Sequence, residues 1–181
     1  MKATGIVRRI DDLGRVVVPK EIRRTMRIRE GQAMEIFTGR EGEIVLKKYS
    51  PIEELTECAG QYAKAMASVL GHLICISDHE QIVAACGPDQ KHYQGKAISE
   101  ELEHVIIERK TVSIRPGERE YIPVLREDAK KMPQVIAPIL SAGDVIGAVM
   151  IIGKTAESIL GEQEKRLAQV AAAYLGQQME Q

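Results

Sequence analysis

The first fifty residues alternate short apolar runs with turn residues. Short stretches rich in Ile and Val that are bounded by Asp, Gly or Pro are typical of β-strands. Pro19 cannot continue an internal strand but suits the first position of a helix, and Ile22 and Met26 then share one helical face. The pattern predicts a β-β-α-β-β unit with strands Gly5–Ile10 and Arg15–Val18, helix Pro19–Arg27, and strands Ala33–Thr38 and Glu43–Lys48.

This small unit has few means of stabilising itself as a single chain. Its apolar side chains are few, and cores of roughly 50 residues are marginal alone. Residues 1–50 contain neither Cys for a disulfide nor His for a metal site. We therefore expect the unit to complete its core with a second copy of the chain, as an obligate dimer.

The second part of the chain begins with the most regular helical pattern in the sequence. Ser50 and Pro51 suit the cap and the first position of a helix, and Glu53 completes a capping box. Apolar residues then recur at helical spacing as far as Gly71, which predicts a helix over Ile52–Leu70. We expect this helix to link the two parts and to pack on the second domain or on its copy in the oligomer.

Beyond the linker helix, apolar runs and helical patterns follow one another, and the charged segment 116–132 is expected to be mostly loop. An antiparallel sheet with helices at both ends of the segment is an α+β fold. We therefore divide the chain into residues 1–50 and 51–181, with residues 51–70 as the linker helix. The expected elements are strands His72–Ser77 and Gln81–Ala85, helix Ser99–Arg109, strands Val135–Leu140 and Val145–Ile152, and helix Gly161–Gln178.

The net charge also differs between the two parts of the chain. The net charge of the whole chain is −1. Residues 1–50 hold 12 Lys and Arg against 7 Asp and Glu, a net charge of +5, whereas residues 51–181 have a net charge of −6. This asymmetry favours a polyanionic partner for the basic part. Trp is absent and Phe occurs once, so the stacking platforms typical of single-strand binders are scarce.

Arginine dominates the basic residues near the N-terminus. Residues 1–29 contain nine basic residues, seven of them Arg, and only three acids. The guanidinium group pairs bidentately with phosphate or with guanine edges, whereas Lys acts as a point charge. Most charge runs are simply solvated surface, but such a surface normally intersperses both signs. The composition therefore favours nucleic-acid binding by this segment.

The same segment resembles a known DNA-binding domain. Residues 5–19, which read GIVRRIDDLGRVVVP, and residues 21–24 are similar to the AbrB-like, swapped-hairpin domain of bacterial transition-state regulators. The resemblance covers nearly all of residues 1–50 and implies an intertwined β-barrel dimer whose strands exchange between chains. It also implies a DNA-binding surface formed by Arg8, Arg15, Arg23 and Arg24, with Arg9 as a further basic position.

The second part is similar to a GAF domain, because residues 137–149 resemble the last central hairpin of that fold. The GAF fold implies a small-molecule pocket between the sheet and its covering loops. The sequence offers no anchor for a nucleotide, haem or bilin, so the ligand stays unidentified. An AbrB-like head on a GAF-like body resembles the sporulation regulators of endospore-forming bacteria. This resemblance implies a cytoplasmic, nucleoid-associated activator and repressor of forespore genes that binds double-stranded DNA and is a homotetramer.

Two other functions compete with this interpretation. Cys75 and Cys86 lie in or beside predicted strands, and some GAF-type proteins reduce free methionine sulfoxide with cysteines. The main alternative is therefore a GAF-type thiol enzyme with a dimerising basic head, although a buried Cys more often only packs. AbrB-like heads also occur in antitoxins, but the globular pattern of residues 51–181 argues against a short toxin-binding tail.

The sequence holds no recognisable catalytic or metal-ligating motif. Gly95 and Lys96 are followed by Ala97 instead of Ser or Thr, so the P-loop pattern fails. The four His and three Cys lack the spacing of metal ligands. The longest apolar run, Val145–Ile152, is too short to cross a bilayer. We expect no enzyme activity, no cofactor, no membrane insertion, and reduced thiols in a cytoplasmic protein.

Overall fold

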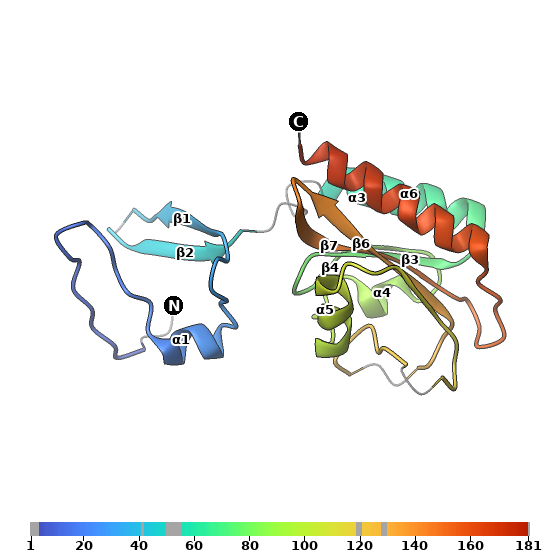
Figure 1. Ribbon diagram of the computed structural model, residues 1–181, viewed down its shortest axis with the longest axis horizontal. Coiled ribbons are helices and arrows are strands. Elements are labelled where there is room, and N and C mark those ends of the chain that lie inside the picture. The colour runs from blue at the N-terminus through green and yellow to red at the C-terminus, as the bar shows by residue number, and fades with distance from the viewer. Residues whose placement is uncertain (1–3, 41, 50–55, 119–120, 128–129, 181) are drawn as a thin grey trace. The chain divides into compact units, whose positions relative to one another are not determined.

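The chain divides into two units, Met1–Tyr49 and Ser50–Gln181, which we call the head and the body and describe separately. The computed structural model describes residues 4–40, 42–49, 56–118, 121–127 and 130–180 (Figure 1). The residue boundaries expected from the sequence, 1–50 and 51–181 with the linker helix at 51–70, remain a prediction.

The head contains one short helix and one β-hairpin. Helix α1 spans Lys20–Thr25 and begins after Pro19. Backbone N–H groups at the start of a helix have no partner within the helix, so proline, which lacks an N–H, costs no hydrogen bond there. Strand β1 (Met34–Thr38) pairs antiparallel with β2 (Ile44–Lys48). The helix and both strands lie where the sequence pattern predicts them.

The two strands predicted before α1, Gly5–Ile10 and Arg15–Val18, are not strands in the single chain. The turn between them does form, because the N–H of Asp11 donates to Arg15 O and the N–H of Gly14 donates to Asp11 O, each at 3.0 Å. Figure 1 shows the chain before α1 as an open loop that runs out and back. A strand exists only beside a second strand, and the described part of the head supplies no ladder partner for either segment.

The body is built on a five-stranded antiparallel sheet. Its strand order is β4-β3-β7-β6-β5, formed by Ile82–Cys86, Leu73–Ser77, Asp144–Ile152, Gln134–Ser141 and Val112–Ile114. The β6–β7 hairpin closes through Ala142 and Gly143, which both have positive φ. Four of the five strands agree with the sequence pattern. Strand β5 was missed because its three residues are too few to show a period.

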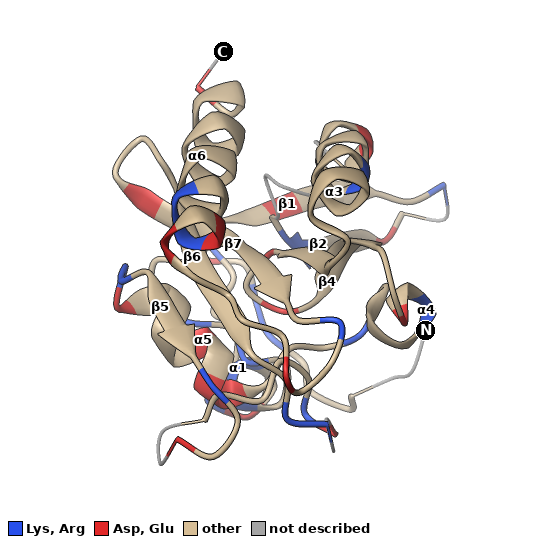
Figure 2. Cartoon of the chain, turned by 90° about the vertical axis from the view of Figure 1, so that its right-hand side faces the viewer, with Lys and Arg blue, Asp and Glu red and all other residues tan. Residues whose placement is uncertain are grey.

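Helices α3 (Thr56–Leu70) and α6 (Glu162–Gln178) lie side by side on one face of the sheet (Figures 1 and 2). The rings of Tyr62 and Tyr174 stack between them with centroids 5.2 Å apart. Small, fully buried residues such as Ala63 and Ala171 let both helices pack closely on the sheet. The capping box predicted at Ser50 to Glu53 lies outside the described residues.

The other face of the sheet is covered by α4 (Gln90–Tyr93) and α5 (Glu100–Ile107). The hydroxyl of Ser99 caps α5 by accepting the N–H of Leu102 at 2.9 Å. Burial on both faces explains why β6 and β7 read as continuous apolar runs instead of alternating ones. Helix α4 was not predicted from the sequence, because its four residues are too few to show a helical period. No helix in the described part of the chain has the length and apolar character needed to span a membrane.

Candidate DNA-binding surface and ligand pocket

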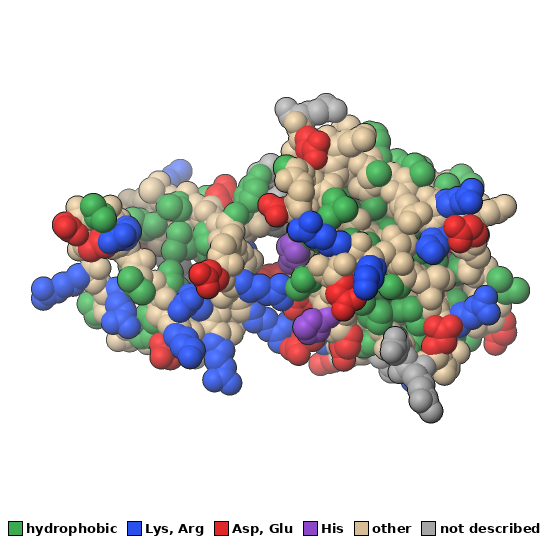
Figure 3. Space-filling view, viewed as in Figure 1, with side chains coloured by type: hydrophobic (Ala, Val, Ile, Leu, Met, Phe, Trp, Pro, Cys, Tyr) green, Lys and Arg blue, Asp and Glu red, His purple; other side chains and the backbone are tan. Residues whose placement is uncertain are grey.

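The five arginines that the resemblance singles out lie around the N-terminal turn and on α1. Arg8 and Arg9 precede the turn, Arg15 follows it, and Arg23 and Arg24 occupy the last turn of α1. All five residues are exposed. Figure 3 shows Lys and Arg side chains distributed over the head with apolar side chains between them. The head thus presents exposed guanidinium groups, which are frequent donors to DNA phosphates.

Asp11 organises the turn that carries Arg15. Its Oδ1 accepts the backbone N–H of Leu13 at 3.0 Å and that of Arg15 at 2.8 Å, and its Oδ2 accepts the Arg15 Nε–H at 2.8 Å. These bonds, the backbone N–H of Arg15 foremost, hold the pKa of Asp11 below its ordinary value. The side chain of Arg15 stays 68% exposed. Asp11 therefore directs this guanidinium group while leaving it open to solvent.

Helix α1 ends in a Schellman motif that has an arginine at its left-handed position. The N–H of Ile28 donates to Arg23 O at 2.7 Å, and the N–H of Arg27 donates to Arg24 O at 3.2 Å. Arg27 has a φ of 52°. The left-handed conformation costs a residue with a Cβ about 1–2 kcal/mol, which is why glycine is usual at this position.

The apolar side chains of the head have no core of their own. Among the described head residues only Pro19 is buried. Val7 is 88% exposed, Val17 71% and Ile36 67%. Other large apolar residues of the head that are exposed are Ile6, Ile10, Leu13, Val16, Met26, Phe37, Ile44, Leu46 and Tyr49. An apolar surface of this extent marks a contact with another molecule.

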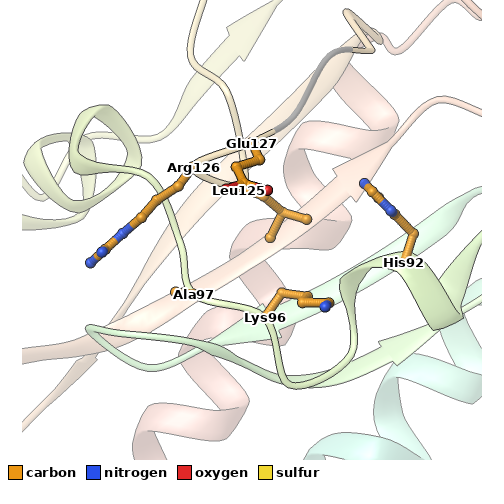
Figure 4. Close-up of a pocket in the computed structure, with 6 residues that line it drawn as sticks. All are labelled: His92, Lys96, Ala97, Leu125, Arg126 and Glu127. Carbon is orange, nitrogen blue, oxygen red and sulfur yellow. The ribbon is translucent and has the colours of Figure 1, made fainter.

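The body contains a pocket of about 300 Å³ where α4 and the segment after it meet the loop 121–127. Its lining residues are His92, Lys96, Ala97, Leu125, Arg126 and Glu127. In Figure 4 the Lys96 and His92 side chains lie on one side of Leu125, and Arg126 extends to the opposite side. The pocket thus combines a buried Leu125 with exposed cationic groups and one carboxylate.

An ion pair and a hydrogen bond hold the segment that follows Leu125 beside the pocket. Lys130 Nζ lies 2.8 Å from Asp89 Oδ2, and this hydrogen bond holds the pKa of Asp89 below its ordinary value. The hydroxyl of Tyr121 accepts the N–H of Met132 at 2.8 Å. Both partners of the ion pair are 59% exposed, so the pair adds little stability.

The thiol-enzyme alternative depends on the reactivity of the cysteines in the body. Cys58, Cys75 and Cys86 are not joined in disulfides, and Cys75 is buried. Cys86 Sγ lies 3.8 Å from Gly60 O, and burial raises the pKa of its thiol. A thiol with a raised pKa is a poor nucleophile at neutral pH, so the thiol-enzyme alternative gains no support. Within the described ranges, no group of three or more His, Cys, Asp or Glu could hold a metal ion.

Sequence reasoning missed the residues that line the pocket. Lys96 and Glu127 come from segments far apart in the sequence, which meet through the isolated bridge between Ile98 and Leu125. Lys96 and Ala97 were considered only as part of a P-loop pattern that fails, and the segment around Glu127 carries no motif.

Comparison with known families divides the chain in a similar way. The family described as "Stage V sporulation protein T C-terminal, transcription factor" matches residues 54–180. The family described as "Antidote-toxin recognition MazE, bacterial antitoxin" matches residues 7–54. The body is also similar to the cofactor binding GAF domain of the nutrient sensor CodY from Clostridium difficile. That likeness has a TM-score of 0.53 at 14% identity and covers 66% of this chain and 83% of the other, so it shows a shared fold.

Two curated proteins of Bacillus subtilis (strain 168) extend this picture. Transition state regulatory protein AbrB is 59% identical over 51 residues, which are 28% of this chain and 52% of that protein. Stage V sporulation protein T is 48% identical over the full length of both proteins. The head is therefore AbrB-like and the body GAF-like, and the chain belongs to the stage V sporulation protein T family.

Proposed function

We propose that the protein is a transcription regulator of sporulation genes that binds double-stranded DNA through a dimer of its head. One observation carries this proposal: a head with exposed arginines and almost no buried apolar residue in the single chain. A partner head would bury the apolar side chains and double the arginines on one two-fold surface. The full-length similarity to stage V sporulation protein T supports it.

The dimer we propose is an intertwined one in which hairpins exchange between chains. Residues 5–10 and 15–18 are rich in Ile and Val yet lack a strand neighbour within the described head. The edges of a partner's strands would supply the missing hydrogen bonds and remove the exposed edges of the β1–β2 hairpin. The open loop of Figure 1 would then become part of a shared β-barrel.

On this dimer the proposed DNA contacts are Arg8, Arg9, Arg15, Arg23 and Arg24. Phosphate contacts give affinity and salt dependence, whereas contacts to base edges give sequence discrimination. Arg15 is positioned for either role because Asp11 fixes the direction of its side chain. The head has no Asn and only one Gln, so we expect broad sequence tolerance and a preference for deformable sites.

Binding to duplex DNA over a range of salt concentrations tests this function. If about six phosphates are neutralised per dimer, log K should fall with log salt at a slope of about −5. Arg→Ala at a phosphate-contacting position removes two contacts per dimer and should flatten the slope by nearly 2. Arg40→Ala, an exposed arginine outside the proposed surface, is the matched control. Loss of binding in Arg40→Ala as large as in Arg15→Ala would show that the surface is misplaced.

For the body we propose a sensory and assembling role, with residues 51–70 linking it to the head. On α6, Leu167, Val170 and Tyr174 are 41%, 59% and 39% exposed and lie at helical spacing on one face. Pairing of this face between two dimers would give the tetramer. Val170→Glu should then halve the particle mass in solution and leave the head dimer intact, whereas Gln169→Glu, with the same new charge on its neighbour, should not.

We also propose that the pocket beside α4 binds a small charged metabolite and that the regulator responds to this ligand. On this proposal the protein acts in the cytoplasm, both as an activator and as a repressor. The Lys96 ammonium and Glu127 carboxylate would orient opposite charges of such a molecule over Leu125. A panel of amino acids, carboxylates and amines, screened for a rise in the melting temperature of the body, tests this role. The rise should disappear in Lys96→Gln.

A further inference from the structure

We infer that Gln94 is a positioning residue of the ligand pocket: its side-chain amide holds the segment that carries Lys96 and Ala97 against the edge of β4, and so fixes where the Lys96 ammonium group lies. The inference deepens the proposed role of the pocket and rests on it. It concerns a residue outside the pocket lining, to which neither the sequence pattern nor the family resemblance draws attention.

Strand β4 lies at an edge of the five-stranded sheet, and the chain that follows α4 runs along this edge. Gln81, just before β4, is bridged to Ala97. The N–H of Ile82 donates to Lys96 O at 2.9 Å, and the N–H of Gly95 donates to Ile82 O at 2.9 Å. Backbone hydrogen bonds therefore complete the edge at the first residue of β4.

Beyond Ile82, one side chain completes the edge. The register between β3 and β4 shifts after Ile76 and skips Val83, so β4 contains a bulge at this point. Gln94 Oε1 accepts the N–H of Ala85 at 2.7 Å, and Gln94 Nε2 donates to Val83 O at 2.9 Å. The amide of Gln94 thus makes the two bonds that the backbone of a neighbouring strand would make.

Hydrogen bonds, and not burial, place the segment that Gln94 belongs to. Buried residues, Tyr93 and Ile98, fix its two ends. The residues between them, 94–97, are all exposed, although two of them line the pocket (Figure 4). A segment with few buried contacts opens easily unless its hydrogen bonds hold it. Gln94 supplies two of the bonds to β4, so we expect its amide to fix the position of the Lys96 ammonium group.

A residue that only completed the sheet edge would behave differently. Its loss would lower the melting temperature of the body and leave affinity at the pocket unchanged. The loss of a positioning residue should weaken binding in protein that remains folded. Gln90 is a matched control, because it is also exposed and its Oε1 accepts the N–H of Gly87 at 3.2 Å. That bond lies outside residues 94–97.

The first measurement is amide hydrogen exchange, followed by NMR in the full-length protein. Gln94→Leu keeps the approximate size of the side chain and removes its hydrogen bonds. The N–H groups of Ile82 and Gly95 bond to backbone within this edge, so they report on the segment and not on the Gln94 amide itself. In Gln94→Leu both should exchange about tenfold faster than in the wild type. Gln90→Leu should leave both rates unchanged.

Gln94→Glu provides a reversible variant. The neutral carboxyl group has the shape of the amide and can both accept from Ala85 and donate to Val83 O, whereas the carboxylate can only accept. Beside a carbonyl oxygen the pKa of this carboxyl should rise above its ordinary value of about 4.3. The protection of Ile82 and Gly95 should therefore be lost near neutral pH and return as the pH falls towards that value. Gln94→Leu should show no such return.

The second measurement is binding of the panel of amino acids, carboxylates and amines. A panel member that raises the melting temperature of the wild type should bind Gln94→Leu about tenfold more weakly and Gln90→Leu with unchanged affinity.

Three results would overturn the inference. The first is faster exchange at Ala85 alone, with Ile82 and Gly95 still protected in Gln94→Leu. The second is unchanged affinity of that variant for the panel member, and the third is an equal loss of affinity in Gln90→Leu. A wild-type protein that bound no member of the panel would instead contradict the proposed ligand. The exchange rates would then decide by themselves whether Gln94 places the segment.

Discussion

Replacing Gly176 of α6 by alanine should destabilise the body, because the helix touches the sheet at this residue. A Cβ built on Gly176 would lie 1.9 Å from the carbonyl oxygen and 3.0 Å from the carbonyl carbon of Leu140 in β6. The clash is with backbone, which cannot rotate away as a flexible side chain could. Either α6 must lift from β6 or the strand must bend, and both loosen the packing of buried α6 residues such as Leu175.

The size of the effect follows from two opposing contributions. Overpacking in a core typically costs 1–3 kcal/mol, and a clash with fixed backbone belongs at or above the upper end, about 3 kcal/mol. Alanine is favoured over glycine inside a helix by about 1 kcal/mol. We therefore expect Gly176→Ala to lower the free energy of unfolding of the body by about 2 kcal/mol.

Gly60 of α3 offers a matched control, because a Cβ there would meet no atom within 4 Å. Gly60→Ala should gain only the helix preference and stabilise the body by about 0.5–1 kcal/mol. Urea unfolding followed by tyrosine fluorescence measures both variants, since four of the five Tyr lie in the body and Trp is absent. A Gly176→Ala protein as stable as Gly60→Ala would refute the close seating of α6 on β6.

Three further predictions concern the head and the thiols. Residues 1–50 alone should form a folded dimer, and a folded monomer at micromolar concentration in sedimentation would contradict the shared core. Cys75→Ala or Cys86→Ala should cost the body about 1–2 kcal/mol in chemical unfolding and leave DNA binding intact; Cys→Ser variants that lost regulation at unchanged stability would indicate redox chemistry instead. Because the fold lowers the pKa of Asp11 from 3.8, its contribution to the turn should be present above that pH and be lost as pH falls below it. The Arg15 amide resonance in NMR should follow this titration, and a resonance that did not move would contradict the Asp11–Arg15 bond.

The elements that the sequence predicted correctly are those whose stabilising partners lie in the same chain. Helix α6 and the β6–β7 hairpin have long apolar patterns because each packs on a large surface of the body. The segments 5–10 and 15–18 have the composition of strands, but no neighbouring strand in the described head completes them. The composition of a segment indicates that it can form a strand. The structure of the single chain shows a strand only where the neighbouring strand belongs to the same chain.

The candidate functional residues also fall into those that the sequence indicated and those that it missed. The exposed arginines could be identified from composition and family resemblance, because charge is a property of the residues themselves. The hydrogen bonds of Asp11 to Arg15 and the positive φ of Arg27 depend on the path of the backbone, which no residue pattern states. The pocket needs two distant segments to meet at Leu125. The sequence therefore indicated the functional residues whose role depends on their own charge. It missed the features that exist only when the folded backbone brings distant segments together.

The central place of β7 in the sheet affects the order in which a newly synthesised chain can fold. β3 pairs with β7 from Leu73 opposite Ile152 to Ser77 opposite Ala148, so the middle of the sheet joins strands that leave the ribosome far apart in time. The head ends at Tyr49 and emerges while most of the body is still untranslated. Neighbouring ribosomes on one messenger RNA would therefore expose heads before either body can close. Pairing of heads during translation would hide their apolar side chains at the stage when aggregation is the greatest risk.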